Sequence, residues 1–277
     1  MLISYEQLKE INNIQVEILK DVTKVCEILG INYYMVHGSL LGTVREHKFI
    51  LGDDDIDIAM KREDYELFLK EGSKYLSENL FIQSNKTDKN YPLEFAKVRD
   101  SATTYIVDSV KNINMNHGVY IDVFPIDNCS NNKMKNRLIN FIYKLMNIRI
   151  SGVYDVDEKI IKKIARLFTG IIFPSYEKTI ALRDVILREN KEGDYVRLSG
   201  GKKREKYIPK EWFDDIEIMS FEGIETFIPK EYHKYLSTIY GDYINRTLIE
   251  KKYSDGSVIE VNACLIDVHN SYKKYMG

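Results

Sequence analysis

The chain contains a short run of closely spaced carboxylates: Asp53, Asp54, Asp55 and Asp57. Successive side chains of a strand point to opposite faces, so in an extended strand Asp53, Asp55 and Asp57 would share one face. Carboxylates crowded on one face repel each other, and their pKa values rise unless a cation neutralises them. Because oxygen ligands favour a hard divalent ion, the run predicts a site for Mg²⁺ or Mn²⁺.

A glycine-serine pair, Gly38-Ser39, precedes these aspartates by about fifteen residues. A turn of this kind offers backbone N–H groups and a hydroxyl to a phosphate. A cation site and a phosphate-binding turn together indicate phosphoryl or nucleotidyl transfer.

Two other interpretations of the aspartates compete with this one. An acidic loop that faces water or caps a helix is the commonest arrangement, but alternation with isoleucine argues against a free loop. An EF-hand loop would use Asp53, Asp55 and Asp57 as its first, third and fifth positions. That loop also requires Gly where Ile58 stands and Glu where Asp64 stands, so we exclude it.

The composition is that of an ordinary soluble globular protein, with 277 residues, 44% of them apolar and 30% charged. This length suffices for one large domain or for a catalytic core with a subdomain. A net charge of −2 gives no overall attraction to nucleic acid. Charged residues near the N-terminus argue against a signal peptide, and no apolar run of about 18 residues predicts a membrane span. Three cysteines without metal-ligand spacing favour a reducing cytoplasm: Cys26, Cys129 and Cys264.

Hydrophobic spacing predicts the elements that would position the aspartates. Apolar residues at helical spacing predict a helix over residues 5–29, closed by Gly30. Predicted strands cover 32–37, 56–60, 81–84, 95–100, 103–107 and 119–124, with a turn and a helical turn over 38–44 and an amphipathic helix over 62–80. Strands thus dominate 32–125 and helices flank them, which is typical of an α+β fold with a mixed-sheet core.

Charge is unevenly distributed along the chain. Residues 131–191, here called the basic segment, contain 13 Lys and Arg against 6 Asp and Glu, a balance of +7 that leaves −9 for the remainder. Helices are predicted there over 132–150, 157–173 and 175–188, with Pro174 separating the last two. Beyond it, short strands are expected around Phe221-Glu222-Gly223 and a helix over 232–240.

The basic segment has two open interpretations. Basic amphipathic helices lie on anionic membrane surfaces, which would suit an acceptor built on a lipid carrier. Alternatively, a helical subdomain packs its apolar stripe on the core and leaves its lysines in water, and we favour this arrangement. Nucleic-acid binding is not expected, because no aromatic platform accompanies the charge.

Several short motifs occur in a fixed order. They are His37–Arg45 (HGSLLGTVR), Asp53–Ile58 (DDDIDI), Phe95–Asp100 (FAKVRD), Ile121–Asp127 (IDVFPID), Phe221–Gly223 (FEG) and Tyr240–Tyr243 (YGDY). The glycine-serine turn followed by Asp-x-Asp resembles the nucleotidyltransferase signature. The whole set resembles the LicD family of bacterial phosphocholine transferases, which is related to fukutin and fukutin-related protein. The resemblance implies a nucleotidyltransferase-like core.

The resemblance implies transfer of a phosphoalcohol from a CDP-linked donor, most often CDP-choline, to a hydroxyl of a cell-surface glycan, with release of CMP. The acceptor would be a glycan or lipid-linked glycan of the lipopolysaccharide, teichoic acid or capsular polysaccharide type, modified in the cytoplasm or at the cytoplasmic face of the membrane. The alternative is a nucleotidyltransferase that places NMP on a sugar phosphate, small molecule or protein and releases pyrophosphate. A degenerate binding domain is disfavoured, because the aspartates are intact.

The resemblance also assigns roles. Asp55, Asp57 and Asp122 would form the catalytic site and hold Mg²⁺ or Mn²⁺, with Asp122 supplied by a neighbouring strand and accepting the proton of the attacking hydroxyl. The competing interpretation of Asp122 is a strand-end acid paired with Lys or Arg. Asp127, which follows Pro125, is more typical of a turn or cap.

The remaining candidates would contact substrate. Gly38 and Ser39 would hold the phosphate of the leaving nucleotide, and Asp53 and Asp54 would orient ligands or water. Lys97 and Arg99 alternate with apolar residues, so both should point the same way, toward phosphate or along a solvated edge. Arg45 would reach a phosphate or pair with an acidic strand residue. His37 is interpreted as a packed strand residue and is not a candidate.

Two departures from the family pattern leave the transferred alcohol open. Leu51-Gly52 stands where the family places Pro-Trp, and Asn245-Arg246-Thr247 stands where a Pro-Pro pair is common. We expect three parts in the chain: a catalytic core over 1–130, a basic helical insertion over 131–190, and a C-terminal part over 191–277 that completes the core and the substrate pocket.

Overall fold

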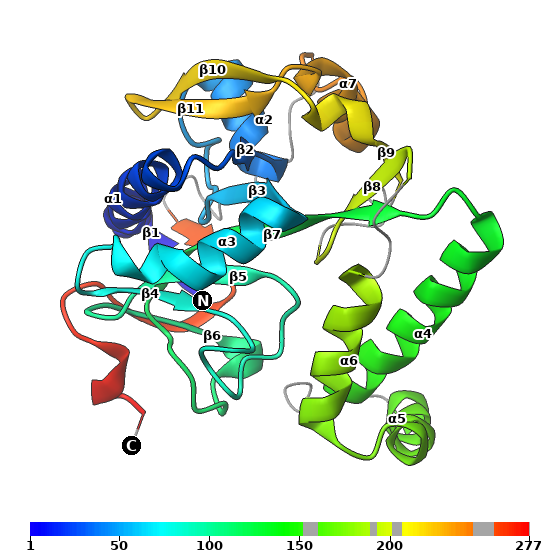
Figure 1. The fold of residues 1–277 in the computed structure, drawn as a ribbon. Helices are drawn as coiled ribbons and strands as arrows, with labels where there is room; N and C mark the ends of the chain where they lie inside the picture. The colour runs from blue at the N-terminus through cyan, green and yellow to red at the C-terminus, as the bar shows by residue number, and fades with distance from the viewer. Residues whose placement is uncertain (152–159, 189–192, 201–206, 246–257, 277) are drawn as a thin grey trace.

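A computed structural model describes residues 1–151, 160–188, 193–200, 207–245 and 258–276 (Figure 1). Its centre is a mixed sheet with the strand order β2-β3-β7-β5-β4, extended by β8 and β9 beside β7. The strands are β2 (Tyr34–Met35), β3 (Asp57–Lys61), β4 (Leu80–Gln83), β5 (Ala96–Asp100), β7 (Val119–Cys129), β8 (Tyr195–Leu198) and β9 (Ile208–Pro209). Helices flank this sheet, so the predicted α+β fold is confirmed.

Strand β7 is the axis of the sheet. It pairs in parallel with β3, and antiparallel first with β5 and then with β8. The prediction that this strand closes at Pro125 is wrong, because β7 continues to Cys129. Proline has no N–H to donate, but its carbonyl accepts a hydrogen bond from the Ser199 N–H at 3.2 Å, so the strand carries on past it.

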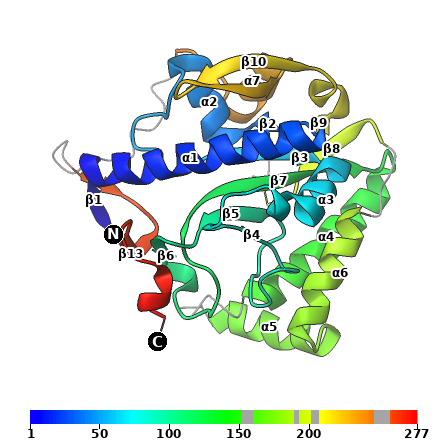
Figure 2. The same cartoon turned by 60° about the vertical axis from the view of Figure 1, so that its left-hand side comes forward.

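Helix α1 (Tyr5–Leu29) runs across the sheet, as Figure 2 shows. Ser4 and Gln7 form a capping box at its start, and Gly30 closes it in the left-handed conformation, with φ 65°. Its buried residues from Ile18 to Cys26 join the main hydrophobic core together with the central strands, and Leu8 and Ile11 join a second apolar cluster. The helix predicted over 5–29 with a Gly30 cap is therefore confirmed.

Two shorter helices flank β3. Helix α2 (His37–Glu46) occupies the segment for which a turn and a single helical turn were predicted, so the helix is longer than expected. Helix α3 (Arg62–Glu71) ends sooner than the predicted residue 80, because a 3₁₀ turn over Gly72–Lys74 follows it. The predicted acidic strand begins one residue late, at Asp57.

The hairpin of β10 (Ile216–Phe221) and β11 (Ile224–Pro229) turns at Glu222 and Gly223, both with positive φ, as a tight hairpin turn requires. Helix α7 (Tyr232–Tyr240) follows it. Both elements were predicted. Phe221 contacts Phe49, with ring centroids 5.1 Å apart, and the hairpin joins the main core.

Two small sheets pair segments that are distant in sequence. Strand β1 (Leu2–Ser4) pairs with β12 (Val258–Glu260), and β6 (Thr104–Val107) pairs with β13 (Ala263–Asp267). The strand predicted over 103–107 thus exists but lies outside the central sheet. The other three strands of these sheets, β1, β12 and β13, were not predicted, because pairing across the whole chain leaves no local pattern.

Helices α4 (Lys133–Ser151), α5 (Ile160–Ile172) and α6 (Tyr176–Arg188) form a separate group below β8 in Figure 1, on the side away from the hairpin. The helices predicted over 132–150 and 175–188 are confirmed. The start of the one predicted over 157–173 lies outside the described residues, as does part of the Asn245-Arg246-Thr247 departure. Division of the chain into three parts stays a prediction. Among the described residues, no helix has the length and apolarity needed to cross a membrane.

Candidate active site

Asp57 and Asp122 lie opposite each other on the two parallel strands β3 and β7. Both are buried, and Asp55 approaches them from the segment just before β3. The Asp122 N–H donates to the Ile56 carbonyl at 2.8 Å, which holds this segment against β7. One oxygen from each of the three carboxylates lies within 4.8 Å of the others. The structure thus brings together the three aspartates singled out in the sequence, while their role as ligands stays a prediction.

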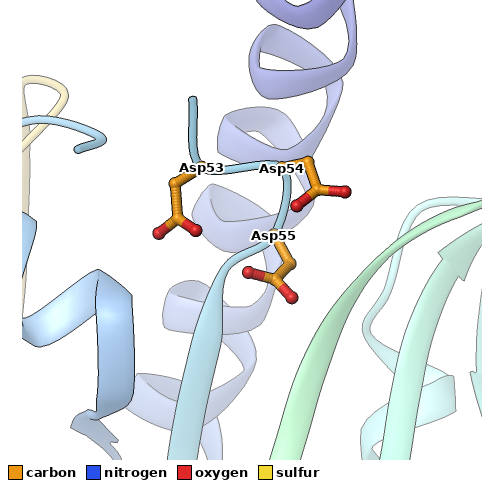
Figure 3. Close-up of side chains that lie close together, drawn as sticks. All are labelled: Asp53, Asp54 and Asp55. Carbon is orange, nitrogen blue, oxygen red and sulfur yellow. The ribbon is translucent and has the colours of Figure 1, made fainter. Parts of the chain in front are cut away.

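The expected strand face shared by Asp53, Asp55 and Asp57 is wrong, because residues 53–56 precede the strand. Figure 3 shows Asp53, Asp54 and Asp55 fanning out from this segment. Their carboxylates also come within 4.8 Å of one another, so Asp55 belongs to both groups. Asp54 accepts a hydrogen bond from the Tyr105 hydroxyl at 2.8 Å. These contacts place Asp53 and Asp54 beside the Asp55–Asp57–Asp122 group.

Helix α1 fixes this acidic segment from behind. The buried Gln15 amide donates to the Asp54 carbonyl at 2.8 Å and to the Tyr120 carbonyl at 3.1 Å. One side chain therefore ties the segment before β3 to strand β7. This is why the carboxylates converge although the segment has no regular structure.

Burial and mutual repulsion disturb the titration of the site. Burial raises the pKa of Asp55 well above its ordinary value of 3.8, and the neighbouring charges of Asp57, Asp53, Asp54 and Asp122 add to it. Burial also raises the pKa of Asp122, with Lys97 opposing and Asp57 reinforcing the shift. A divalent cation would relieve this repulsion, and the carboxylate oxygens are the donor set that Mg²⁺ or Mn²⁺ prefers. The residues fit such an ion.

Lys97 lies inside the site. Its Nζ forms an ion pair with Asp122 Oδ1 and sits over the Tyr120 ring, 3.4 Å from the centroid. Burial lowers the pKa of Lys97, while Asp122 opposes the shift. The structure therefore excludes the solvated edge considered for this residue. Asp122 pairs with a lysine, as its competing interpretation expected, and it also belongs to the carboxylate group, while its role as a ligand stays a prediction.

Arg99 points to the same side of the sheet as Lys97, as expected, because its guanidinium also stacks on Tyr120, 4.7 Å from the ring centroid. Its Nε donates to Gln83 Oε1 at 2.5 Å and its Nη1 to the Gly118 carbonyl at 2.6 Å. The side chain is fully buried beneath the site. These contacts indicate that Arg99 supports the Tyr120 ring. Phosphate binding by Arg99 stays a prediction.

The start of helix α2 faces the aspartates. A Cβ on Gly38 would lie 2.6 Å from Asp53 Oδ2, so any side chain here would displace the Asp53 carboxylate. The Ser39 hydroxyl accepts a hydrogen bond from the Asp57 N–H at 2.8 Å. The pair therefore organises the acidic residues, and phosphate binding by Gly38 and Ser39 stays a prediction.

His37 belongs to the site although the sequence analysis left it out. It begins α2 with a positive φ of 51°, rather than ending a strand. Its Nδ1 lies 3.4 Å from Asp57 Oδ2, and its ring packs edge-on against Phe124. The sequence does contain a signal for this role, because His37 directly precedes Gly38-Ser39. Interpretation of His37 as a packed strand residue left this signal unused.

Two further residues differ from expectation. Arg45 stands in the last turn of α2, about 10 Å along the helix axis from Gly38. Among the described residues its acidic partner is Glu46, at 3.9 Å, rather than a strand residue, and a contact of Arg45 with phosphate stays a prediction. Asp127 is a buried strand residue and not a turn or cap, because β7 continues through it, and Arg62 binds its two oxygens at 2.6 and 2.7 Å.

Comparison with known proteins gives two matches. Residues 30–149 match the family described as LicD/FKTN/FKRP, nucleotidyltransferase domain. The lipopolysaccharide cholinephosphotransferase LicD of Haemophilus influenzae is 27% identical over 252 residues, which cover 86% of this chain and 91% of that protein. The family match contains all three convergent aspartates. The resemblance predicted from the short motifs is confirmed.

Proposed function

We propose that this chain, a transferase that carries the nucleotidyltransferase domain of the LicD family, moves a phosphoalcohol from a CDP-linked donor to a hydroxyl of a cell-surface glycan and releases CMP. The observation that carries the proposal is the convergence of Asp55, Asp57 and Asp122 inside the matched domain. The relative named as a lipopolysaccharide cholinephosphotransferase supports phosphocholine as the group and lipopolysaccharide as the acceptor. Teichoic acid and capsular polysaccharide stay alternative acceptors.

Asp55, Asp57 and Asp122 would hold one or two Mg²⁺ or Mn²⁺ ions. Bound there, an ion would neutralise charge on the donor diphosphate. The raised pKa of Asp55 supports this assignment, because crowded buried carboxylates are costly in the absence of a cation. Asp53 and Asp54 would orient ligands beside the site.

The reaction is an in-line displacement at the phosphorus that bears the alcohol. Asp122 accepts the proton of the acceptor hydroxyl, whose oxygen forms the new bond to this phosphorus. The bond from phosphorus to the bridging oxygen breaks, and CMP leaves with its electrons. The ion pair with Lys97 keeps the Asp122 carboxylate oriented, and the Ser39 hydroxyl holds the backbone of Asp57.

The start of α2 would receive the leaving phosphate. Helix N-termini carry partial positive charge, and the first backbone N–H groups of a helix lack partners within it. Gly38 and Ser39 stand in this first turn. Since Asp53 occupies the space next to Gly38, a phosphate there would need the cation to offset the carboxylate.

We place the enzyme in the cytoplasm, at the cytoplasmic face of the membrane where lipid-linked glycans are modified. Choline is the transferred alcohol that the relative supports. Leu51-Gly52, directly before Asp53, is the departure from the family pattern that lies next to the site. Because of this departure, CDP-linked donors that carry different alcohols must be compared as substrates.

The test is a donor panel. The purified chain is incubated with Mg²⁺ and, separately, CDP-choline, CDP-ethanolamine, CDP-glycerol, CDP-ribitol, CTP and ATP, and CMP and pyrophosphate are measured. CMP from one CDP-alcohol supports the proposal and identifies the alcohol, whereas pyrophosphate from a triphosphate would establish nucleotidyl transfer instead.

Variants of the aspartates control this assay. Asp55→Ala and Asp57→Ala should abolish turnover while circular dichroism shows a folded chain. The matched control is Asp215→Ala, which changes an exposed aspartate directly before strand β10 and should keep full turnover. Retained turnover in both site variants would refute the mechanism.

A further inference from the structure

Helix α5 presents its apolar side to water. The exposed fractions of these residues are 54% for Ile164, 75% for Leu167, 64% for Phe168, 75% for Ile171 and 59% for Ile172. Spacing of three and four residues places them on one face of the helix. A surface helix of a globular protein normally turns such a face toward the core. The arrangement favoured from the sequence, an apolar stripe packed on the core, is therefore wrong for α5.

The opposite side of α5 faces the protein with small and polar residues. Thr169 is buried and Ala165 is half-buried. Arg149 of α4 donates to the carbonyls of Phe173 and Pro174, at 3.0 and 3.3 Å, just beyond the end of α5. These contacts fix how the helix is rotated, so exposure of its apolar face is built into the fold.

The charges of α5 are all positive. Its sequence, IIKKIARLFTGII, contains Lys162, Lys163 and Arg166 and no acid. The preceding helix α4 likewise contains five basic residues and no acid, and its Arg149 lies beside the end of α5. Figures 1 and 2 show α5 at the outer end of the helical group, away from the β10–β11 hairpin. An exposed apolar face beside positive charge complements an anionic lipid surface.

We propose that α5 docks the enzyme on an anionic lipid bilayer, with its axis in the plane of the interface and its apolar face among the lipid headgroups and acyl chains. Thirteen residues are too few to span a bilayer, so the helix lies on it. A second copy of this chain fits less well, because two such helices would bring like charges together. The inference rests on the proposed function in one respect: docking would bring the enzyme to the lipid surface that carries a lipid-linked acceptor.

Vesicle co-sedimentation tests the docking without donor or acceptor. Wild type should bind vesicles of phosphatidylcholine with about 30% phosphatidylglycerol at about 50 mM salt, and binding should weaken about tenfold at about 500 mM salt or with pure phosphatidylcholine. The vesicle assay needs no turnover, so absence of vesicle binding would not argue against the proposed transfer reaction. Likewise, absence of CMP release in the donor panel would not argue against docking of α5.

Leu167→Glu/Ile171→Glu should reduce vesicle binding at least about tenfold, because two charges enter the apolar face. The matched control, Ile28→Glu/Ile218→Glu, changes two isoleucines that are more than half exposed on α1 and β10, and it should bind as wild type does. Circular dichroism checks that each variant folds. Phe168→Trp should show a blue-shifted fluorescence that brominated lipids quench.

Three results would overturn the proposal. Unchanged binding by the Leu167→Glu/Ile171→Glu variant would exclude α5 as the docking element. Equal binding to pure phosphatidylcholine would exclude the charge complementarity. A lipid-free dimer in sedimentation velocity that Leu167→Glu/Ile171→Glu dissociates would show that a second copy covers the face instead.

Discussion

The aspartate site and helix α5 depart in opposite ways from the usual pattern, in which charged residues are exposed and apolar residues are buried. At the site, Asp57, Asp122 and Lys97 are buried charges, whereas Leu167 and Ile171 on α5 are apolar residues that are 75% exposed. Burying charge and exposing apolar surface both cost free energy. In our proposals a different partner would offset each cost: a cation and a diphosphate at the first region, and a lipid surface at the second. Departures of this kind indicate which ligand a region is built for.

The two regions also differ in how they are fixed. The aspartates converge through long-range contacts, namely the Asp57–Asp122 register, the Gln15 amide and the Ser39 hydroxyl. Helix α5 depends mainly on its neighbours in sequence, through contacts with α4. Loss of a long-range partner at the first region should therefore destabilise the fold, whereas changes on the exposed face of the second should leave both chemistry and stability unaffected.

The largest effect should follow from Asp57→Asn. The change keeps the shape of the side chain but removes a charge from the carboxylate group, so CMP release should fall on the order of 1,000-fold. In the absence of metal, the variant should be at least as stable as wild type, because repulsion decreases. Thermal unfolding in EDTA checks this. A variant that is both inactive and strongly destabilised would indicate a structural role for Asp57.

Lys97→Met should destabilise the fold by about 3–5 kcal/mol, because it leaves the buried Asp122 without its partner. Urea denaturation in EDTA measures this loss. The double variant Lys97→Met/Asp122→Asn removes both charges and should recover most of the stability. A loss that is the same in both variants would contradict the coupling between the two residues.

Isoleucines in the two regions should respond differently to truncation. Ile58→Ala removes a core residue of β3 and should cost about 2–5 kcal/mol. Ile171→Ala on α5 should change the free energy of unfolding by no more than about 0.5 kcal/mol, since little is buried. Urea denaturation of both variants compares them directly. A large cost for Ile171→Ala would mean that the α5 face is covered in solution.

Two glycines offer a matched pair. Gly38→Ala places a Cβ 2.6 Å from Asp53 Oδ2, so the carboxylate must move, which should lower CMP release and cost about 0.5–1.5 kcal/mol. Gly170 of α5 faces open space, so Gly170→Ala should stabilise the chain by about 1 kcal/mol through helix propensity. Thermal and urea unfolding measure both effects. Equal effects of the two changes would argue against the close approach at Gly38.

Stability without metal should depend on pH through Asp55. Its pKa is raised in the folded chain, so between the unfolded value of about 3.8 and the folded one the native state binds more protons. The free energy of unfolding should therefore fall as the pH rises across this interval, and Mg²⁺ should remove the decline. Urea unfolding at several pH values, in EDTA and in Mg²⁺, follows it. Asp55→Asn should show a shallower slope, and an identical slope would exclude Asp55 as its source.

Local pattern in the sequence was sufficient for several elements. Apolar spacing and Gly30 predicted α1, and short strands were expected around Phe221-Glu222-Gly223, because caps and short strands are encoded by neighbouring residues. The convergence of Asp55, Asp57 and Asp122 was also predicted, because the resemblance to the nucleotidyltransferase signature implied a third carboxylate from a neighbouring strand.

Features that depend on tertiary contacts were missed. His37 contacts Asp57 only because α2 begins there with a positive φ. Burial of Lys97 and Arg99 depends on the stack over Tyr120, which no local pattern encodes. Periodicity likewise predicted the amphipathic α5, but it does not say which face turns to the protein.

The central claim is that the buried carboxylates hold a divalent cation for phosphoalcohol transfer, and Mn²⁺ binding followed by electron paramagnetic resonance tests it most directly. With CDP-choline present, wild type should reduce the free Mn²⁺ signal and Mg²⁺ should compete, whereas Asp55→Asn and Asp57→Asn should leave the signal unchanged. Equal Mn²⁺ binding by wild type and both variants, or CMP release by wild type in excess EDTA, would contradict the account.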